Sequence, residues 1–588
     1  MDPDYPCSSV SACSAANKLA RFALEVLVSV VRYGLLVWSS FWKLIFRAAA
    51  SVQPPKAVLP PIRDEILLMS LQDISSKLKA REISCVEVMQ CFINRTKVIN
   101  PFLNALVDER FEDALRDAEV VDQRIQTAAD TGSIEDLFAN YPLLGLPLSN
   151  KDSIAVKGLR QTVGLHLRKD VIAEDHARVV QRLVDAGAIP LCVTTVPEVC
   201  MHWECTNSIH GRTNNPYDIR RTSGGSSGGE GAFQTACGSS ISIGSDIGGS
   251  IRIPAFFNGI FGLKPSAGII SNQGQYPPLS GERGKLLVLG PLCRHAKDLS
   301  MILPHIVEDL EVKKNLSSRN PESDLQTLRV FYMTNDTGNP LTTPVSGDCS
   351  RALRKVIQHF KSRGIPVRKV NLKRLFHSCG IWMSTMFPQG GNEQDYTFLQ
   401  ELGNRGAAHI NPYLELLKLC IGKGKYTLSS LVVAIFESLG TSLIKCTSFQ
   451  RTLQEMGQQL RLEFDQLLGA NGIFLYPTWT RTAPFHNESI AGPFDFGYTC
   501  IFNALHLPAV TCPMGLDSQG LPVGVQAVAN FKQDHHLLTI AEEIERAFGG
   551  WVCPSSIEIE THDADIETHD ADIETHDADT LRHTMRTH

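Results

Sequence analysis

The stretch from Thr222 to Arg252 limits most strongly what this chain can fold into, because glycine is unusually dense there. Paired glycines flank Ser226 and Ser227, and Ser250 follows the run Asp246-Ile247-Gly248-Gly249. Glycine loses the most conformational freedom on ordering, so such a cluster indicates positive φ angles or a close approach of the backbone to another group. Small residues before a serine can also direct backbone N–H groups to one point beside its hydroxyl, as in an oxyanion hole.

A flexible linker is the commonest use of a Gly/Ser-rich segment, and the sequence argues against it here. Residues 232–236 predict a short helix, and the alternation of Ile241 and Ile243 predicts a strand, both between the two glycine clusters. A linker has no need of ordered elements at this spacing. The segment also lacks the Gly-Lys-Ser/Thr sequence of a phosphate-binding loop.

Residues 224–228 match the Gly-x-Ser-x-Gly pattern of the nucleophile elbow of α/β-hydrolases. That elbow follows directly on a buried strand, whereas residues 214–221 have the composition of turns and predict no strand. We therefore reject the α/β-hydrolase interpretation.

A serine nucleophile needs a base, and a lysine can serve if burial lowers its pKa from the ordinary value of about 10.4. Residues 145–152 predict an apolar strand with Lys151 near its end. Taken together, Lys151, the segment 224–231 and the segment 245–252 resemble the amidase signature family, and they occur in the family's order. The resemblance covers about residues 67–554.

This resemblance implies a Ser-Ser-Lys triad for amide hydrolysis. Ser250 would be the nucleophile, and neutral Lys151 would be the terminal base. Ser226, which would follow a cis peptide bond, would transfer protons between them. An acyl-enzyme on Ser250 would then be released by water, without a metal or an organic cofactor.

The resemblance also assigns roles to the residues around the triad. Ser227 would support the site by hydrogen bonding, and Arg252 by pairing with a carboxylate such as Asp246. The backbone N–H groups expected to hold the oxyanion are those of Ile247, Gly248, Gly249 and Ser250.

Strands and helices alternate along the chain, which indicates an α/β fold with a parallel or mixed sheet. A predicted helix at 177–186 is followed by a buried strand at 189–193, and a capping box at Ser84 and Glu87 begins a helix expected to reach Val98. We expect a single large amidase-signature domain over residues 58–554, with a twisted mixed sheet covered by helices.

Residues 1–57 are predicted to form a separate membrane-associating helix and linker. Residues 22–50 are apolar but interrupted by charges, and their longest clean apolar run is about half of the ~20 residues that a spanning helix needs. On helical spacing they form an apolar stripe opposite a basic one, typical of a helix lying in a membrane surface. A helix packed on the protein's own core and a tilted span are the alternatives.

Further segments resemble the family members that hydrolyse fatty-acid amides at membranes, among them residues 201–204, 254–262 and 548–554. One enzyme of that branch caps its channel with a membrane-facing helix pair, which the resemblance places at 413–420 and 426–439. The second segment is equally well interpreted as a buried core helix.

The charge of the chain is unevenly distributed. The formal net charge is −6, but residues 557–588 carry ten acidic residues and two arginines, so the remainder is close to neutral. The sequence has no basic face that would indicate nucleic-acid binding. The sequence Ile-Glu-Thr-His-Asp-Ala-Asp occurs three times between Ile559 and Asp579, and its polarity predicts a disordered acidic tail over 555–588. The 16 cysteines have no zinc-like spacing, which favours reduced thiols in an intracellular setting.

These observations predict a membrane-associated serine hydrolase that cleaves primary fatty-acid amides such as oleamide, or N-acylethanolamines. Its expected partners are the fatty-acid amide substrate and a membrane lipid surface, at the endoplasmic reticulum or a lipid droplet, and a homodimer stays open. Two other classes are alternatives: an amidotransferase subunit or small-amide amidase, and a catalytically silent membrane scaffold.

Overall fold

The computed structural model describes residues 58–386, 396–444 and 447–559, together with a few positions between 34 and 52. The predicted N-terminal membrane-associating helix and most of the acidic repeat therefore lie outside the described residues. Among the residues described, no helix is both long enough and apolar enough to cross a membrane.

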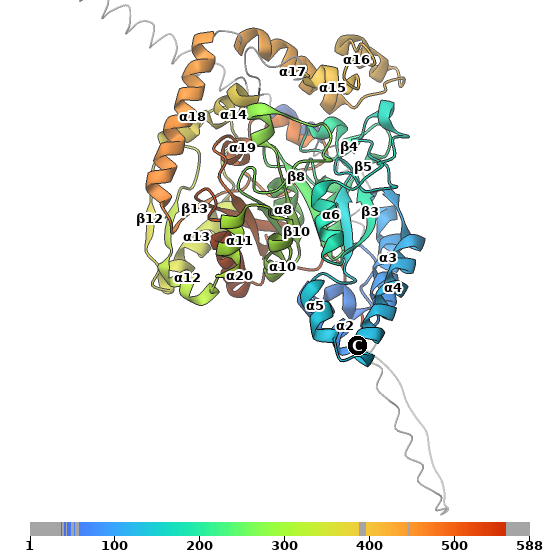
Figure 1. Ribbon diagram of the computed structural model, residues 1–588. Helices are drawn as coiled ribbons and strands as arrows, with labels where there is room; N and C mark the ends of the chain where they lie inside the picture. The colour runs from blue at the N-terminus through green and yellow to red at the C-terminus, as the bar shows by residue number, and fades with distance from the viewer. Residues whose placement is uncertain are drawn as a thin grey trace, which may run out of the picture.

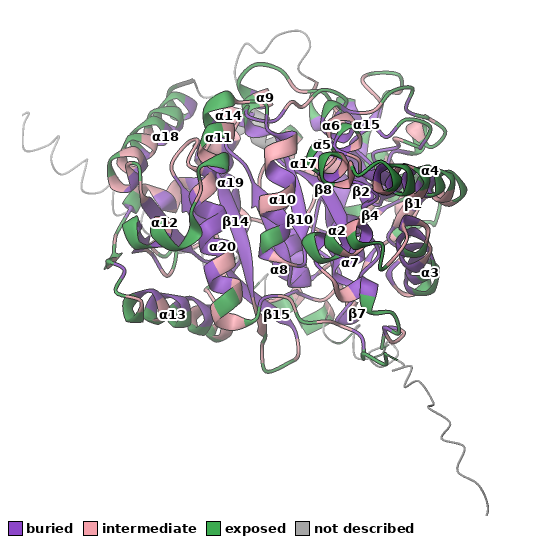
Figure 2. Cartoon of the chain, turned by 60° about the horizontal axis from the view of Figure 1, so that its bottom comes forward, coloured by how far each residue is buried: buried purple, intermediate pink, exposed green. Residues whose placement is uncertain are grey.

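An eleven-stranded mixed sheet forms the centre of the protein (Figure 1), which confirms the expected α/β fold class. Helices cover the sheet, and the strands at its centre are buried (Figure 2). Across the sheet the strands are β1 (Leu106–Glu109), β3 (Ile189–Thr194), β2 (Pro147–Lys151), β8 (Ile241–Asp246), β10 (Val288–Cys293), β9 (Phe261–Lys264), β14 (Ala509–Leu516), β15 (Pro522–Ala529), β13 (Gly472–Tyr476), β11 (Arg329–Tyr332) and β12 (Val367–Lys369).

The helices lie on both faces of the sheet and above one of its edges. The α-helices of the described chain are α2 (Leu71–Ala80), α3 (Cys85–Leu103), α4 (Phe111–Asp130), α5 (Ile134–Asn140), α6 (Arg178–Asp185), α7 (Gly228–Thr235), α8 (Arg252–Asn258), α9 (Gly281–Leu286), α10 (Ala296–Ile306), α11 (Leu310–Ser317), α12 (Pro321–Thr327), α13 (Gly347–Ser362), α14 (Ser378–Met386), α15 (Phe398–Leu402), α16 (Pro412–Cys420), α17 (Leu428–Ile444), α18 (Thr447–Leu468), α19 (Gly497–Ala504) and α20 (Asp534–Phe548).

Strands β2 and β8 determine where the site forms. They pair in parallel, with Ser149 opposite Ser242, so their carboxyl ends lie at the same edge of the sheet. Every residue of both strands is buried. A parallel strand covered by helices on both faces has this near-continuous burial. Lys151, the last residue of β2, and Asp246, the last of β8, therefore end beside each other.

Two local predictions differ from the structure. The capping box of Ser84 and Glu87 begins α3 as expected, but the helix continues past Val98 through Pro101 to Leu103. It ends where Asn104 takes a left-handed φ of 51° and donates its N–H to the Asn100 carbonyl.

The segment before the first glycine cluster contains a strand, so the prediction that it holds only turns is wrong. Strand β6 (Asn214–Asn215) pairs with β7 (Asp218–Thr222) in a two-stranded sheet of its own. The hairpin stands apart from the eleven-stranded sheet, so the strand that precedes a nucleophile elbow in the main sheet is still missing here. Helix α7 also begins earlier than predicted, inside the glycine cluster.

The chain after Pro554 still packs on the domain. Ile62 forms a parallel bridge with Ile557, and its N–H donates to the Ser556 carbonyl at 2.8 Å. The guanidinium of buried Arg95 donates to the Ser555 hydroxyl at 2.7 Å. The contacts of the globular unit thus extend about four residues beyond the predicted boundary at 554.

Truncation should separate this segment from the repeat. Ending the chain after Pro554 removes one of the hydrogen-bond acceptors of Arg95 and the bridge to Ile62, at a cost of about 1–3 kcal/mol. For a domain of this size that lowers Tm by about 1–3 °C. Ending the chain after Ile559 should leave Tm unchanged in the same thermal-unfolding measurement. Equal Tm values for the two truncations would show that residues 555–559 contribute nothing.

Candidate active site

Lys151 ends β2, and no carboxylate of the described chain forms a hydrogen bond or ion pair with it. Its side chain is fully buried, and its Nζ lies 2.7 Å from Ser226 Oγ and 2.9 Å from Ser245 Oγ. The Ser245 carbonyl is a third partner at 3.4 Å. Burial disfavours the charged ammonium and lowers the pKa of Lys151 below its ordinary value. The lysine is thus placed to exchange a proton with Ser226.

Ser226 lies in a tight loop between β7 and α7, and the Gly225–Ser226 peptide bond is cis. Gly224 has a φ of 78°, a conformation that favours glycine. A side chain on Gly225 would collide with the carbonyl oxygen of His202. The paired glycines are required because two backbone segments approach closely at this point.

Ser250 follows a turn that the Asp246 carboxylate organises. Asp246 Oδ1 accepts the Gly249 N–H at 2.7 Å, and its Oδ2 accepts the Ile251 N–H at 3.1 Å. Gly249 has a φ of 129°, and a side chain there would collide with Thr499.

The Gly249 N–H is therefore already engaged, whereas the sequence predicted that it would be one of four N–H donors to the oxyanion. Within the described chain, no hydrogen-bond acceptor contacts the N–H groups of Ile247, Gly248 or Ser250. These three donors can face a ligand.

Asp246 and Arg252 form a fully buried ion pair at 3.0 Å, the pairing that the sequence suggested. Burial alone would raise the pKa of Asp246, but the Arg252 guanidinium, together with Lys264 and the Ile251 N–H, holds that pKa well below its usual range. Arg252 also donates to the Thr499 carbonyl at 2.9 Å and to Asn503 Oδ1 at 2.7 Å. The turn is thus tied to α19.

Ser227 connects the two glycine clusters. Its N–H donates to the Ser250 carbonyl at 3.1 Å, and its hydroxyl donates to the Ser245 carbonyl at 3.3 Å. Within the described chain, Lys151 forms hydrogen bonds with Ser226 and Ser245 but not with Ser227. The geometry of Ser227 suits support of the backbone around Ser250.

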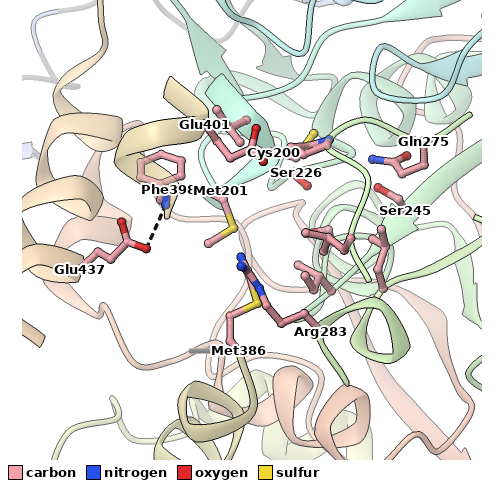
Figure 3. Close-up of a pocket in the computed structure, with 16 residues that line it drawn as sticks. Cys200, Met201, Ser226, Ser245, Gln275, Arg283, Met386, Phe398, Glu401 and Glu437 are labelled. Carbon is pink, nitrogen blue, oxygen red and sulfur yellow. Dashed lines mark hydrogen bonds between the residues drawn. The ribbon is translucent and has the colours of Figure 1, made fainter. Parts of the chain in front are cut away.

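A narrow cavity of about 50 Å³ brings Ser226, Ser245 and Ser250 to one surface. Figure 3 shows Ser226, Cys200 and Gln275 together at one end, with Glu437 and Phe398 at the other. Many of its walls are apolar, and they include Val199, Met201, Ile247, Leu279, Leu287 and Met386. Pockets for drug-sized ligands enclose roughly 300–1,000 Å³, so a large ligand must displace side chains here.

The charged side chains at the far end of this cavity each have protein partners. Glu437 of α17 accepts the N–H groups of Phe398 and Leu399, at 2.9 and 3.2 Å, and so caps α15. Glu401 pairs with Arg405 at 3.2 Å. Burial raises the pKa of both carboxyl groups.

The structure adds residues that sequence reasoning missed. Ser245 lies inside the recognised motif, but its contact with Lys151 depends on the pairing of β8 with β2. Trp382 Nε1 donates to the Ile247 carbonyl at 2.7 Å, and Asn503 Nδ2 donates to the Asp246 carbonyl at 3.0 Å. Both come from distant helices, and no local pattern points to them. Among the residues described, no group of three or more His, Cys, Asp or Glu could hold a metal ion.

Comparison with known proteins shows the family and the fold of the chain. The sequence model of the family described as Amidase matches residues 87–538. The chain is 39% identical to fatty-acid amide hydrolase 2 of Homo sapiens over 517 residues, covering 87% of this chain and 95% of that protein. It is 40% identical to fatty-acid amide hydrolase 2-A of Danio rerio over 503 residues, covering 85% and 93%. The solved structure of a fatty acid amide hydrolase has the same fold, with a TM-score of 0.64 at 22% identity, covering 88% of this chain and 95% of that one.

Proposed function

The chain belongs to the amidase family and is an amide-hydrolysing enzyme, and we propose that it cleaves fatty-acid amides at a membrane surface through Ser250, Ser226 and Lys151. The observation that carries the proposal is the 2.7 Å contact between Lys151 Nζ and Ser226 Oγ, in a cavity that Ser250 also lines. A buried lysine without a carboxylate partner is a base whose neutral form is favoured. Burial is the main reason why the pKa of Lys151 is lowered.

In the first step Ser250 Oγ forms a bond to the amide carbon. The Ser250 proton passes to Ser226 as the Ser226 proton passes to Lys151, which becomes an ammonium ion. The carbonyl oxygen becomes an oxyanion, for which the free N–H groups of Ile247, Gly248 and Ser250 are the available donors.

In the second step the proton returns from Lys151 through Ser226 to the amide nitrogen, and the C–N bond breaks. Without that proton the amine would be a poor leaving group. Water then attacks the acyl group on Ser250 and gives a proton to the same relay. The ester bond to Ser250 Oγ breaks, the relay returns the proton to that oxygen, and the fatty acid leaves. The Ser245 hydroxyl holds Lys151 Nζ in place throughout.

The substrate class follows from the cavity walls and from the relatives. Val199, Met201, Leu279 and Met386 present apolar surface beside the serines, which suits an acyl chain. Relatives at 39–40% identity carry the name fatty-acid amide hydrolase 2, which supports oleamide and N-acylethanolamines as substrates. A small-amide amidase or an amidotransferase subunit has no need of such walls.

Serine labelling tests the assignment and also the alternative of a silent scaffold. Wild type should react with a fluorophosphonate and hydrolyse oleamide, and Ser250→Ala should lose both because the nucleophile is gone. Ser226→Ala should keep slow labelling and hydrolyse oleamide roughly 10²–10⁴-fold more slowly, the usual contribution of a proton-transfer group. Labelling that survives in Ser250→Ala but not in Ser226→Ala would make Ser226 the nucleophile. No labelling of wild type would identify a scaffold.

The pH dependence of the rate tests Lys151. Only the neutral amine accepts a proton, so kcat/KM should fall as the pH drops through the lowered pKa of Lys151. Lys151→Ala should be slow at neutral pH and recover partly at high pH, where hydroxide replaces the base. Lys157→Ala, at an exposed lysine of the next loop, should keep the wild-type profile. A Lys151→Ala enzyme as fast as wild type at every pH would exclude the role.

Membrane association is proposed for the outer face of α16. Leu417 of α16 and Ile421, the residue directly after that helix, are 60% and 63% exposed, and Tyr413 and Leu414 lie on the same helix. Lys418, Lys423 and Lys425 lie beside them around a second cavity. Exposed apolar residues with basic neighbours suit an anionic lipid surface.

The two-helix interpretation of this region needs a correction. Leu431 and Ala434 of α17 are fully buried in an apolar cluster with Leu165 and Phe398, so this part of α17 belongs to the core. The side chain of Phe436 lies outside the described residues. An endoplasmic reticulum or lipid-droplet location and a homodimer remain proposals.

Charge placed on α16 tests the membrane face. The pair Leu417→Asp and Ile421→Asp should reduce co-sedimentation with anionic phospholipid vesicles about tenfold or more, since both apolar contacts are lost. Hydrolysis of a short water-soluble amide should stay within twofold of wild type. Leu310→Asp, on exposed α11, is the matched control and should bind vesicles normally. Unchanged sedimentation of the double variant would place the membrane contact elsewhere.

A further inference from the structure

Glu198 connects the wall of the cavity to the start of α17. It begins the short helical turn η3 (Glu198–Cys200) that follows β3, and its side chain is only 1% exposed. Its carboxylate accepts the Thr427 N–H at 3.0 Å and the Thr427 hydroxyl at 3.0 Å. It also accepts the Ser208 N–H at 3.2 Å. A carboxylate here satisfies free N–H groups and complements the positive end of the helix.

The residues directly after Glu198 form the cavity wall beside the serines. Val199 and Cys200 have φ angles of 55° and 58°, and both line the cavity together with Met201. Left-handed backbone is unfavourable for a β-branched residue such as valine. Such a conformation persists only where the surroundings fix it.

Helix α17 supplies those surroundings. Val199 packs in the apolar cluster that contains Leu431 and Ala434 of α17. The far half of α17 also reaches the cavity, because Glu437 caps α15 and Phe398 of that helix lines the opposite end. In Figure 1 α15, α16 and α17 lie together above the sheet edge. Helix α17 thus contacts residues at both ends of the cavity.

We infer that Glu198 is a positioning residue that fixes the cavity wall Val199–Met201 to α17, and that this tie sets how well the site accepts a long acyl chain. The inference rests on the proposed function, since it concerns the same site and the same substrate class. A long chain must pass along the wall from Phe398 to the serines. A short amide occupies only the reactive end and does not depend on the far part of the wall.

A role as a helix cap alone makes a different prediction. Loss of a cap lowers stability without changing the preference between long and short substrates. Asn411 is a matched case, because its side chain caps neighbouring α16 by accepting the N–H groups of Tyr413 and Leu414. Asn411 does not line the cavity, so Asn411→Ala measures the effect of a lost cap by itself.

The experiment compares kcat and KM for oleamide and for a short water-soluble primary amide, with Tm recorded for every variant. Glu198→Ala and Thr427→Val should each lower kcat/KM for oleamide about tenfold, mainly through KM, as expected when a hydrogen bond to a charged group is lost. Hydrolysis of the short amide should change less than twofold. Glu198→Gln, which keeps an acceptor oxygen, should restore most of the oleamide activity.

The double variant and the cap control decide between the two roles. Glu198→Ala combined with Thr427→Val should lower oleamide activity no further than Glu198→Ala alone, because Glu198→Ala already removes the contact to the Thr427 hydroxyl. Asn411→Ala should lower Tm and leave the ratio of oleamide to short-amide activity unchanged. The inference is overturned if that ratio is unchanged in Thr427→Val, or if Asn411→Ala shifts it equally.

Failure of the proposed function would give a different result. If wild type hydrolyses neither amide but is labelled by fluorophosphonates, the rates with long-alkyl and short-alkyl probes replace the two substrates. A drop confined to the long probe in Glu198→Ala and Thr427→Val supports the tie whatever the natural substrate is. Equal rates for both probes in all variants overturn it. Thr427→Val keeps this test available if Glu198→Ala fails to fold.

Discussion

The buried pair of Asp246 and Arg252 is the interaction on which the rest of the site depends. Taking two ions out of water costs several kcal/mol for each, and their attraction offsets this only with good geometry and further hydrogen bonds. Both ions have those bonds, since Asp246 accepts backbone N–H groups of the turn and Arg252 donates to Thr499 and Asn503. The pair therefore fixes the turn before Ser250 to the core, and it leaves other N–H groups of that turn free.

Lys151 shows the opposite treatment of a buried cation. Arg252 is fully buried beside a carboxylate, whereas Lys151 is fully buried among hydroxyl and carbonyl oxygens. An ion pair would keep a lysine charged and useless as a base, whereas among neutral oxygens desolvation is the largest influence on the pKa of Lys151 and lowers it. Lys151 ends β2 and Arg252 begins α8 beside the end of β8, so the difference between a structural and a reactive charge lies in their nearest partners.

Local sequence patterns were enough to predict part of this arrangement. The strand ending at Lys151, the strand at 241–246 and the pairing of Arg252 with Asp246 depend on neighbours in the chain or on a recognised motif. The contacts of Trp382 and Asn503 could not be predicted, because they depend on how α14 and α19 pack against the turn. Whether Leu431 faces lipid or protein could not be predicted for the same reason. An apolar helix position does not reveal whether lipid or protein covers it.

Helix α17 connects the two ends of the cavity, because it packs on Val199 and caps α15. At one end the parallel strands deliver Lys151 and Asp246 to the sheet edge, and at the other end Leu417 of α16 and Ile421, directly after that helix, are exposed. The cavity between them is too narrow for an acyl chain at rest, and its walls carry Met201 and Met386, whose unbranched side chains adapt readily to a new shape. The backbone of the wall is fixed by contrast, because Glu198 holds one end of α17 and Glu437 connects the helix to α15. The acyl chain of the proposed substrate would therefore meet flexible side chains on a rigid frame. This combination lets the cavity widen while the serines keep their positions.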